Sequence, residues 1–185
     1  LLARVNGCLG AVLLVLTGLA MAASPGLITL FAPGFADAPA QLALAAEMLR
    51  LTFPYLLLIA LTAAAAAVLN TYESFGPPAF APVLLNLALI GAAWLVAPRL
   101  ETGVMALALA VPVAGALQLA LQLPFLWRRG LLRWPTLQWR DARVRRILRL
   151  MGPTLFSTSV QQLNLLLDTV LASFLVAGSI SWLYW

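Results

Sequence analysis

Residues 102–127 read TGVMALALAVPVAGALQLALQLPFLW, a stretch of 26 residues without a charged side chain. An α-helix needs about 20 predominantly apolar residues to cross the hydrocarbon core of a bilayer. Four further charge-free runs, with 32, 22, 25 and 18 residues, cover 5–36, 51–72, 74–98 and 150–167. Each run is long enough, or nearly so, to cross. The sequence therefore predicts an all-α membrane protein, a polytopic bundle of transmembrane helices.

The composition agrees with a membrane protein and excludes several kinds of chemistry. Of the residues, 63% are hydrophobic and 9% are charged, whereas about a quarter are charged in soluble domains. The chain has no His, which excludes a Ser-His-Asp triad and a His-ligated metal site. Its single cysteine, Cys8, forms neither an internal disulfide nor a Cys-pair zinc site. No Gly-x-x-x-x-Gly-Lys loop for ATP occurs. We expect no enzyme activity, no cofactor and no metal.

Proline and glycine clusters predict where the helices break. The first span, Val5 to Phe31, should kink or fray at Ser24-Pro25-Gly26, because proline removes a backbone donor. The second helix, 38–71, should kink at Phe53-Pro54-Tyr55. The remaining spans are expected at 79–96, 104–127 and 151–176, and a sixth begins at 181–185. Because the chain starts at Leu1 and stops inside an apolar stretch, we expect an internal piece of a longer transporter-like protein.

Residues 128–149 form a basic segment that holds 8 of the 11 arginines and one acid, Asp141. Loops rich in arginine stay cytoplasmic, so this segment predicts the orientation of the bundle. Asp141 is expected to cap a short amphipathic helix. Its arginines, Arg143, Arg146 and Arg149, have two readings: they bind anionic lipid headgroups, or they only set the topology. Nucleic-acid binding is not expected of so short a loop.

A row of polar residues marks the fifth span: Thr154, Ser157, Gln161, Asn164 and Asp168. Their spacing of 3, 4, 3 and 4 places all five on one side of a helix. Such a row, here called the polar stripe, faces protein or water rather than lipid, and its carboxylate is a candidate functional group. Two interpretations stay open, a cavity lining or hydrogen bonding between helices. Gln118, Gln122 and Asn86 are weaker candidates for the same interior.

Several ordered motifs resemble those of the MurJ/MviN lipid II flippase family. They include Ala32-Pro33-Gly34-Phe35, Thr52-Phe53-Pro54-Tyr55, Phe75-x-x-Pro78-Ala79-Phe80-Ala81-Pro82, Met151-Gly152-Pro153, Asp168-Thr169 and Gly178-Ser179-Ile180-Ser181-Trp182-Leu183-Tyr184. The resemblance covers essentially the whole chain. The flippases of this family belong to the multidrug/oligosaccharidyl-lipid/polysaccharide exporter superfamily.

The resemblance implies a part of a larger, roughly fourteen-helix transporter with two lobes, covering helices three to seven and the start of eight. Residues 1–127 would be four helices of the N-terminal lobe, 128–150 the cytoplasmic amphipathic segment, and 151–185 the start of the C-terminal lobe. The family's cavity arginines of the first two helices and its last two helices have no counterpart here. Among the family's cavity positions, only Ser181, the polar stripe and Asn86 match residues of this sequence.

The function implied is transport of the undecaprenyl-pyrophosphate-linked peptidoglycan precursor across the bacterial inner membrane by alternating access, in cell wall biosynthesis. The expected partners are this precursor, membrane lipids and cell wall synthesis proteins. Two alternatives remain at this stage. One is a cation-coupled drug antiporter of the same superfamily, with Asp168 as the coupling acid. The other is a membrane scaffold whose Arg-rich loop recruits cytoplasmic proteins.

Overall fold

The computed structural model describes residues 2–35, 38–132, 136 and 141–173. All regular elements in these ranges are helices, which confirms the all-α class. In chain order the elements are α1 (Leu2–Ala22), α2 (Ser24–Phe31), η1 (Pro33–Phe35), α3 (Pro39–Thr52), α4 (Pro54–Thr71), α5 (Gly76–Gly91), η2 (Ala92–Val96), η3 (Ala97–Arg99), α6 (Val104–Arg128) and α7 (Ala142–Ser173).

Prolines divide the first two apolar runs at the expected places. The helix α1 ends at Ala22, and α2 begins at Ser24 with Pro25 in its first turn. The helix α3 ends at Thr52, and α4 begins at Pro54. Proline fits the first turn of a helix because its missing N–H would have no partner there. Both predicted breaks are therefore present in the structure.

Four helical stretches are long and apolar enough to cross a membrane among the described residues. They are Val5–Ala22, Pro39–Thr71, Gly76–Arg99 and Val104–Arg128. These stretches match the first four predicted spans, except that the first ends at Ala22 instead of Phe31. The chain is a multi-pass membrane protein.

The basic segment and the predicted fifth span are joined in one helix. The 32 residues of α7 continue through Pro153 without a break between the two. Proline is tolerated in membrane helices because neighbouring groups satisfy the freed carbonyl. Among the described side chains of α7, the apolar stretch is Gln162–Leu171. A full fifth span stays a prediction, and the predicted sixth at 181–185 lies outside the described residues.

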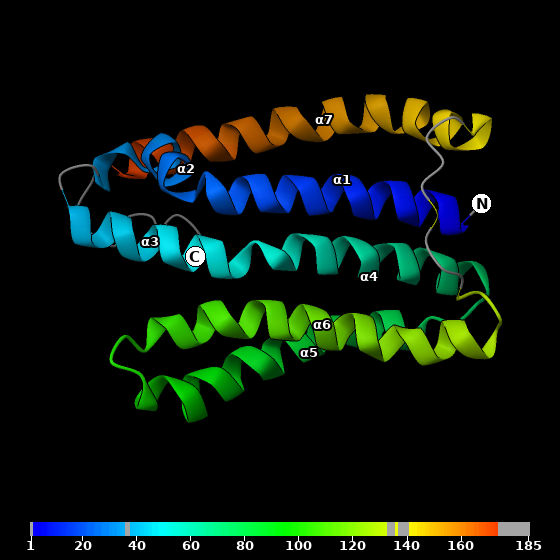
Figure 1. Cartoon of the computed structure of the whole chain (residues 1–185), viewed down its shortest axis with the longest axis horizontal. Helices are drawn as coiled ribbons and strands as arrows, with labels where there is room; N and C mark the ends of the chain where they lie inside the picture. The colour runs from blue at the N-terminus through cyan, green and yellow to red at the C-terminus, as the bar shows by residue number, and fades with distance from the viewer. Residues whose placement is uncertain (1, 36–37, 133–135, 137–140, 174–185) are drawn as a thin grey trace. The chain divides into compact units, whose positions relative to one another are not determined.

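Contacts divide the chain into two compact units, which are described separately. The first unit comprises Leu1–Met21 and Met48–Gln138, and the second comprises Ala22–Glu47 and Trp139–Trp185. In the first unit α6 packs against both α4 and α5, as Figure 1 shows. In the second unit α7 contacts α2 and η1.

The core of the first unit follows a single row along α6. Every fourth residue is buried, in the order Ala106, Ala110, Ala114, Gln118, Gln122 and Leu126. Small residues let membrane helices approach closely. At Gly115 the approach is so close that an added Cβ would lie 2.7 Å from Cδ2 of Tyr55 and 3.0 Å from Cβ of Leu58. Glycine at this position is therefore what lets α6 lie against α4.

The helix α6 ends in a Schellman cap. The N–H of Gly130 donates to the carbonyl of Trp127 at 2.8 Å, and the N–H of Leu131 donates to that of Leu126 at 3.0 Å. Gly130 has a φ of 64°, the left-handed conformation that this cap requires. The cap returns Leu131 onto the core residue Leu126.

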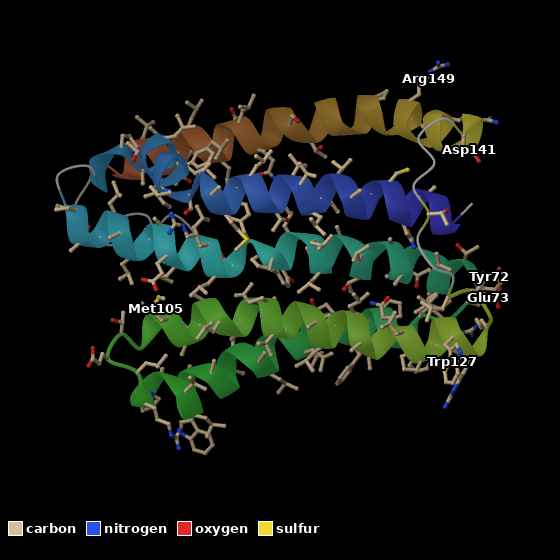
Figure 2. The ribbon with its side chains drawn as sticks, in the orientation of Figure 1. Tyr72, Glu73, Met105, Trp127, Asp141 and Arg149 are labelled. Atoms are coloured by element: carbon tan, nitrogen blue, oxygen red, sulfur yellow. The ribbon has the colours of Figure 1, made fainter. Side chains whose placement is uncertain are left out.

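The helix α4 ends in the same cap with a less suitable residue. The N–H groups of Glu73 and Ser74 donate to the carbonyls of Asn70 and Leu69 at 3.1 and 2.9 Å. Glu73 has a φ of 56° and stands where α6 has a glycine. Figure 2 shows Glu73 and Trp127 at one end of the first unit, with Met105 at the other. The loops that follow α4 and α6 therefore leave from the same end.

Candidate functional site

All five residues of the polar stripe lie in the uninterrupted helix α7, and the stripe is called the α7 stripe from here on. Their spacing therefore places them along one side of α7, as predicted. The described side chains of Asn164 and Asp168 are both exposed. The side chains of Ser157 and Gln161, and the whole of Ser181, lie outside the described part. The role of the stripe as a cavity lining stays a prediction.

A neighbouring threonine shows how a hydroxyl on α7 is satisfied without a ligand. The Oγ1 of Thr169 donates to the backbone carbonyl of Leu165 at 2.8 Å. This is the common bond from a helical threonine to the preceding turn. A carboxylate accepts hydrogen bonds and donates none, so Asp168 has no equivalent bond to a helix carbonyl. Asp168 is thus the residue of this stripe that most needs water, a cation or a donor.

Gln118 and Gln122 are the most deeply buried polar side chains of α6, at 2% and 0% exposure. The Nε2 of Gln118 donates to the backbone carbonyl of Ala81 on α5 at 2.9 Å. This bond links α6 to α5 one residue before Pro82. The Oε1 of Gln118 and both polar atoms of Gln122 have no partner among the described residues. The pair is a buried polar site inside the helix bundle.

The sequence analysis ranked Gln118 and Gln122 as weak candidates for the interior, but both are deeply buried. The signal was present, because two amides four residues apart stand in the middle of a charge-free span. Asn86, by contrast, is exposed on α5. Within the first unit, Asn86 therefore does not share the buried environment of Gln118 and Gln122. Its proposed place in a transport cavity stays a prediction.

The arginines proposed to contact lipid headgroups belong to the first turns of α7. The side chains of Arg146 and Arg149 are exposed, and that of Arg143 lies outside the described side chains. Asp141 directly precedes the first residue of the helix, the position of an N-cap. Figure 2 shows Asp141 and Arg149 in this part of the helix. In the described ranges, no group of three or more His, Cys, Asp or Glu residues could hold a metal ion.

Comparison with known proteins assigns a family to this arrangement. The family model described as "Lipid II flippase MurJ" matches residues 1–185. The chain belongs to this family. The resemblance noted from the sequence motifs is thereby confirmed.

The relatives include proteins of several bacteria. The chain is 45% identical over 189 residues to a probable lipid II flippase MurJ of Haemophilus influenzae, covering 98% of this chain and 37% of that protein. It is 42% identical over 192 residues to the corresponding Vibrio cholerae protein, covering 100% of this chain and 37% of that protein. A lipid II flippase MurJ of Burkholderia cenocepacia is 48% identical over 144 residues, or 76% of this chain and 28% of that protein. The chain spans 37%, 37% and 28% of the length of these three relatives.

Proposed function

We propose that the protein carrying this chain transports lipid II, the undecaprenyl-pyrophosphate-linked peptidoglycan precursor, across the bacterial inner membrane. The observation that carries the proposal is the family match over residues 1–185. The names of the relatives support it, since each is called a lipid II flippase or a probable one. Transport by alternating access requires no covalent chemistry, so the protein acts as a transporter and not as an enzyme.

The proposed orientation has the basic segment, 128–149, in the cytoplasm. The arginine excess in this segment supports that orientation. The shared end of α4 and α6 also supports it, because the loops after these helices must lie on the same side of the membrane. A cysteine at Thr136, in a Cys8→Ala background, is expected to stay unlabelled by an impermeant reagent added outside intact cells. Labelling from outside would reverse the orientation.

The proposed substrate cavity includes the α7 stripe, Asn86 and Ser181. The one-sided spacing of the stripe supports this role, as does the exposure of Asn164 and Asp168 in the second unit. An ionisable residue within a membrane helix is costly unless it faces water or a partner, which favours a hydrated cavity over lipid for Asp168.

The proposed headgroup contacts are Arg143, Arg146 and Arg149. The exposure of the last two supports contact with anionic lipid. Replacing all three by Gln should weaken the binding of a 140–149 peptide to anionic vesicles by about 1 kcal/mol per residue. Unchanged binding would leave these arginines a topological role.

A chimera tests the proposed transport directly. The segment of the Haemophilus influenzae relative that aligns with this chain is replaced by residues 1–185, and the chimera is expressed in cells depleted of their own lipid II flippase. We expect growth and normal exposure of lipid II on the outer leaflet. A chimera carrying Gly115→Leu, which should not pack, serves as the inactive control. A chimera that inserts into the membrane at normal levels without supporting growth would contradict the proposal.

A further inference from the structure

An apolar cavity of about 370 Å³ lies inside the first unit, between α1, α4 and α6. Along α4 it extends from Leu57 to Val68, which corresponds to about 16 Å at the helical rise of about 1.5 Å per residue. The cavity is therefore elongated along the direction in which the helices cross the membrane. Its lining is Asn6, Gly7, Gly10, Ala11, Leu14, Leu57, Leu61, Ala65, Val68, Leu119, Leu123, Leu126, Leu131 and Leu132.

Small residues on α1 leave this cavity open. Small side chains in membrane helices usually bring two backbones into contact. A Cβ added at Gly10, however, would meet no atom within 4 Å, so this face of α1 borders empty space. Gly7, one turn earlier, differs: a Cβ there would lie 2.5 Å from the backbone oxygen of Thr136. The backbone of Thr136 thus closes the cavity next to Gly7.

The end of the cavity is built by the Schellman cap of α6. The cap folds Leu131 back onto Leu126, and both line the cavity together with Leu132. Arg128 and Arg129 stand between these apolar residues in the sequence and are both exposed. The cap therefore turns Leu131 inward while leaving the side chains of Arg128 and Arg129 accessible at the same helix end.

This end carries the features of a membrane interface. Trp127, which is 74% exposed, and Tyr72 lie there together (Figure 2). Both residue types are enriched where a membrane meets water. Glu73, which is exposed, lies at the same end (Figure 2). Arg128 and Arg129 together carry two positive charges and Glu73 carries one negative charge, so these three residues have a net positive charge.

We propose that this cavity holds one acyl chain of an anionic membrane phospholipid, whose phosphate binds Arg128 and Arg129. The acyl chain lies along α4 between α1 and α6. The headgroup lies in the leaflet at which α4 and α6 end. This lipid site is separate from the proposed transport cavity, and its occupancy does not depend on transport of lipid II.

The acyl chain and the headgroup of the proposed lipid have different roles, because the acyl chain is already surrounded by hydrocarbon in the bilayer. A hydrocarbon chain gains no hydrophobic free energy by leaving lipid for an apolar cavity. It gains dispersion contacts with a lining that would otherwise border a void. Selectivity must then come from the headgroup, where arginine forks bind phosphate oxygens in pairs. The proposal thus predicts that any acyl chain fits and that the charge of the headgroup decides affinity.

Filling the cavity tests the acyl-chain half. In purified protein, bound phosphatidylglycerol is counted by native mass spectrometry over a lipid titration. Gly10→Leu places a side chain in the open space and should abolish retention. Gly18→Leu is the matched control on α1, because Gly18 also has free space around it but does not line the cavity. Ala11→Leu is a second filling variant, and far-UV circular dichroism verifies that each variant is folded.

Changing charges at the cavity end tests the headgroup half. Arg128→Gln and Arg129→Gln should each weaken phosphatidylglycerol binding about fivefold, as expected for one arginine near anionic lipid. Glu73→Gln should strengthen binding, because it removes the opposing charge. Arg99→Gln, in η3 before the start of α6, should leave binding unchanged. Phosphatidylcholine with identical acyl chains should bind more weakly than phosphatidylglycerol to the wild-type protein and equally to the Arg128/Arg129 double variant.

Three results would overturn the proposal. Unchanged retention in folded Gly10→Leu and Ala11→Leu proteins would show that lipid does not enter the cavity. Equal binding of phosphatidylglycerol and phosphatidylcholine to the wild type would refute the role of the arginines. Displacement of phosphatidylglycerol by equimolar undecaprenyl phosphate, with tighter binding of the latter, would assign the cavity to the isoprenoid substrate class.

Discussion

The helices α6 and α7 both carry polar residues on one side, and the structure treats them differently. On α6, Gln118 and Gln122 are enclosed between neighbouring helices, and one of them bonds to Ala81 of α5. On α7, Asn164 and Asp168 are exposed, as are nearby leucines such as Leu167. A polar periodicity therefore identifies a face of a helix but does not say what covers it. The row on α6 is part of the core of the first unit, whereas Asn164 and Asp168 of the row on α7 are exposed in the second unit.

The largest expected effect tests whether α6 is enclosed. Gly115→Leu should destabilise the protein by about 1–3 kcal/mol, the range for overpacking a well-packed interior, because Tyr55 and Leu58 already occupy the space. Thermal unfolding in detergent measures the change. Gly91→Leu, whose added Cβ has free space, is the matched control. Equal melting temperatures for the two variants would break the contrast between an enclosed α6 and an open α7.

The two glutamines of α6 should respond in opposite directions to the same substitution. Gln118→Leu loses the bond to Ala81 and should cost about 1 kcal/mol. Gln122→Leu removes an amide that is fully buried without a partner among the described residues, and should stabilise by about 1–2 kcal/mol. For a chain of this size each kcal/mol corresponds to about 2–4 °C in Tm. A destabilised Gln122→Leu protein would mean that buried water or another group satisfies this amide.

The ends of α4 and α6 allow a finer test within the enclosed unit. Both helices end in a Schellman cap, with Glu73 on α4 and Gly130 on α6 in the left-handed conformation. Because this conformation is strained for any residue with a Cβ, Glu73→Gly should stabilise by about 1 kcal/mol and Gly130→Ala should destabilise by about as much. Glu73→Ala keeps the strain and separates it from the loss of charge. A stabilising Gly130→Ala would contradict the cap.

The sequence predicted the fold well where a local signal was sufficient. The breaks at Pro25 and Pro54 followed from the missing N–H of proline, and the first four spans followed from the lengths of charge-free runs. The sequence analysis treated the amphipathic helix and the fifth span as separate elements, whereas the structure joins them in α7, which continues through Pro153 because one interior proline does not end a membrane helix. The Schellman cap with Glu73 was not predictable, since glutamate has no preference for the left-handed conformation.

The candidate site was predictable only in part, because burial depends on neighbours that lie far away in the sequence. Nothing around Gln122 distinguishes it from Asn164 as a sequence pattern. The first is enclosed because α4 and α5 flank α6, which is a property of the packing. The cavity between α1, α4 and α6 depends on three helices and the returned Leu131, so no single stretch of sequence reports it.

The smallest expected effect on stability belongs to Asp168, and it is the sharpest test of the open face. In a Cys8→Ala background, Asp168→Cys should react with a small water-soluble thiol reagent, whereas Leu166→Cys, pointing away from the stripe, should not. Bound lipid II should protect the cysteine at position 168 if substrate and reagent compete for one cavity. Asp168→Asn retains shape and most hydrogen bonding but loses the charge, so Tm should stay within about 2 °C, as for a surface substitution, while transport falls.

Each outcome at Asp168 assigns the α7 stripe to one of its two interpretations. Reactivity at 168 without reactivity at 166 requires water along the stripe, which a lipid-facing or tightly packed helix does not provide. An unreactive cysteine at 168, together with an Asp168→Asn protein that supports growth, would mean that the stripe holds helices together as Gln118 does on α6. In that case the polar rows of α6 and α7 would both bond to neighbouring helices, and the two rows would differ only in how much of their packing this chain supplies. A charge-dependent transport defect without loss of stability would instead separate the two helices by function.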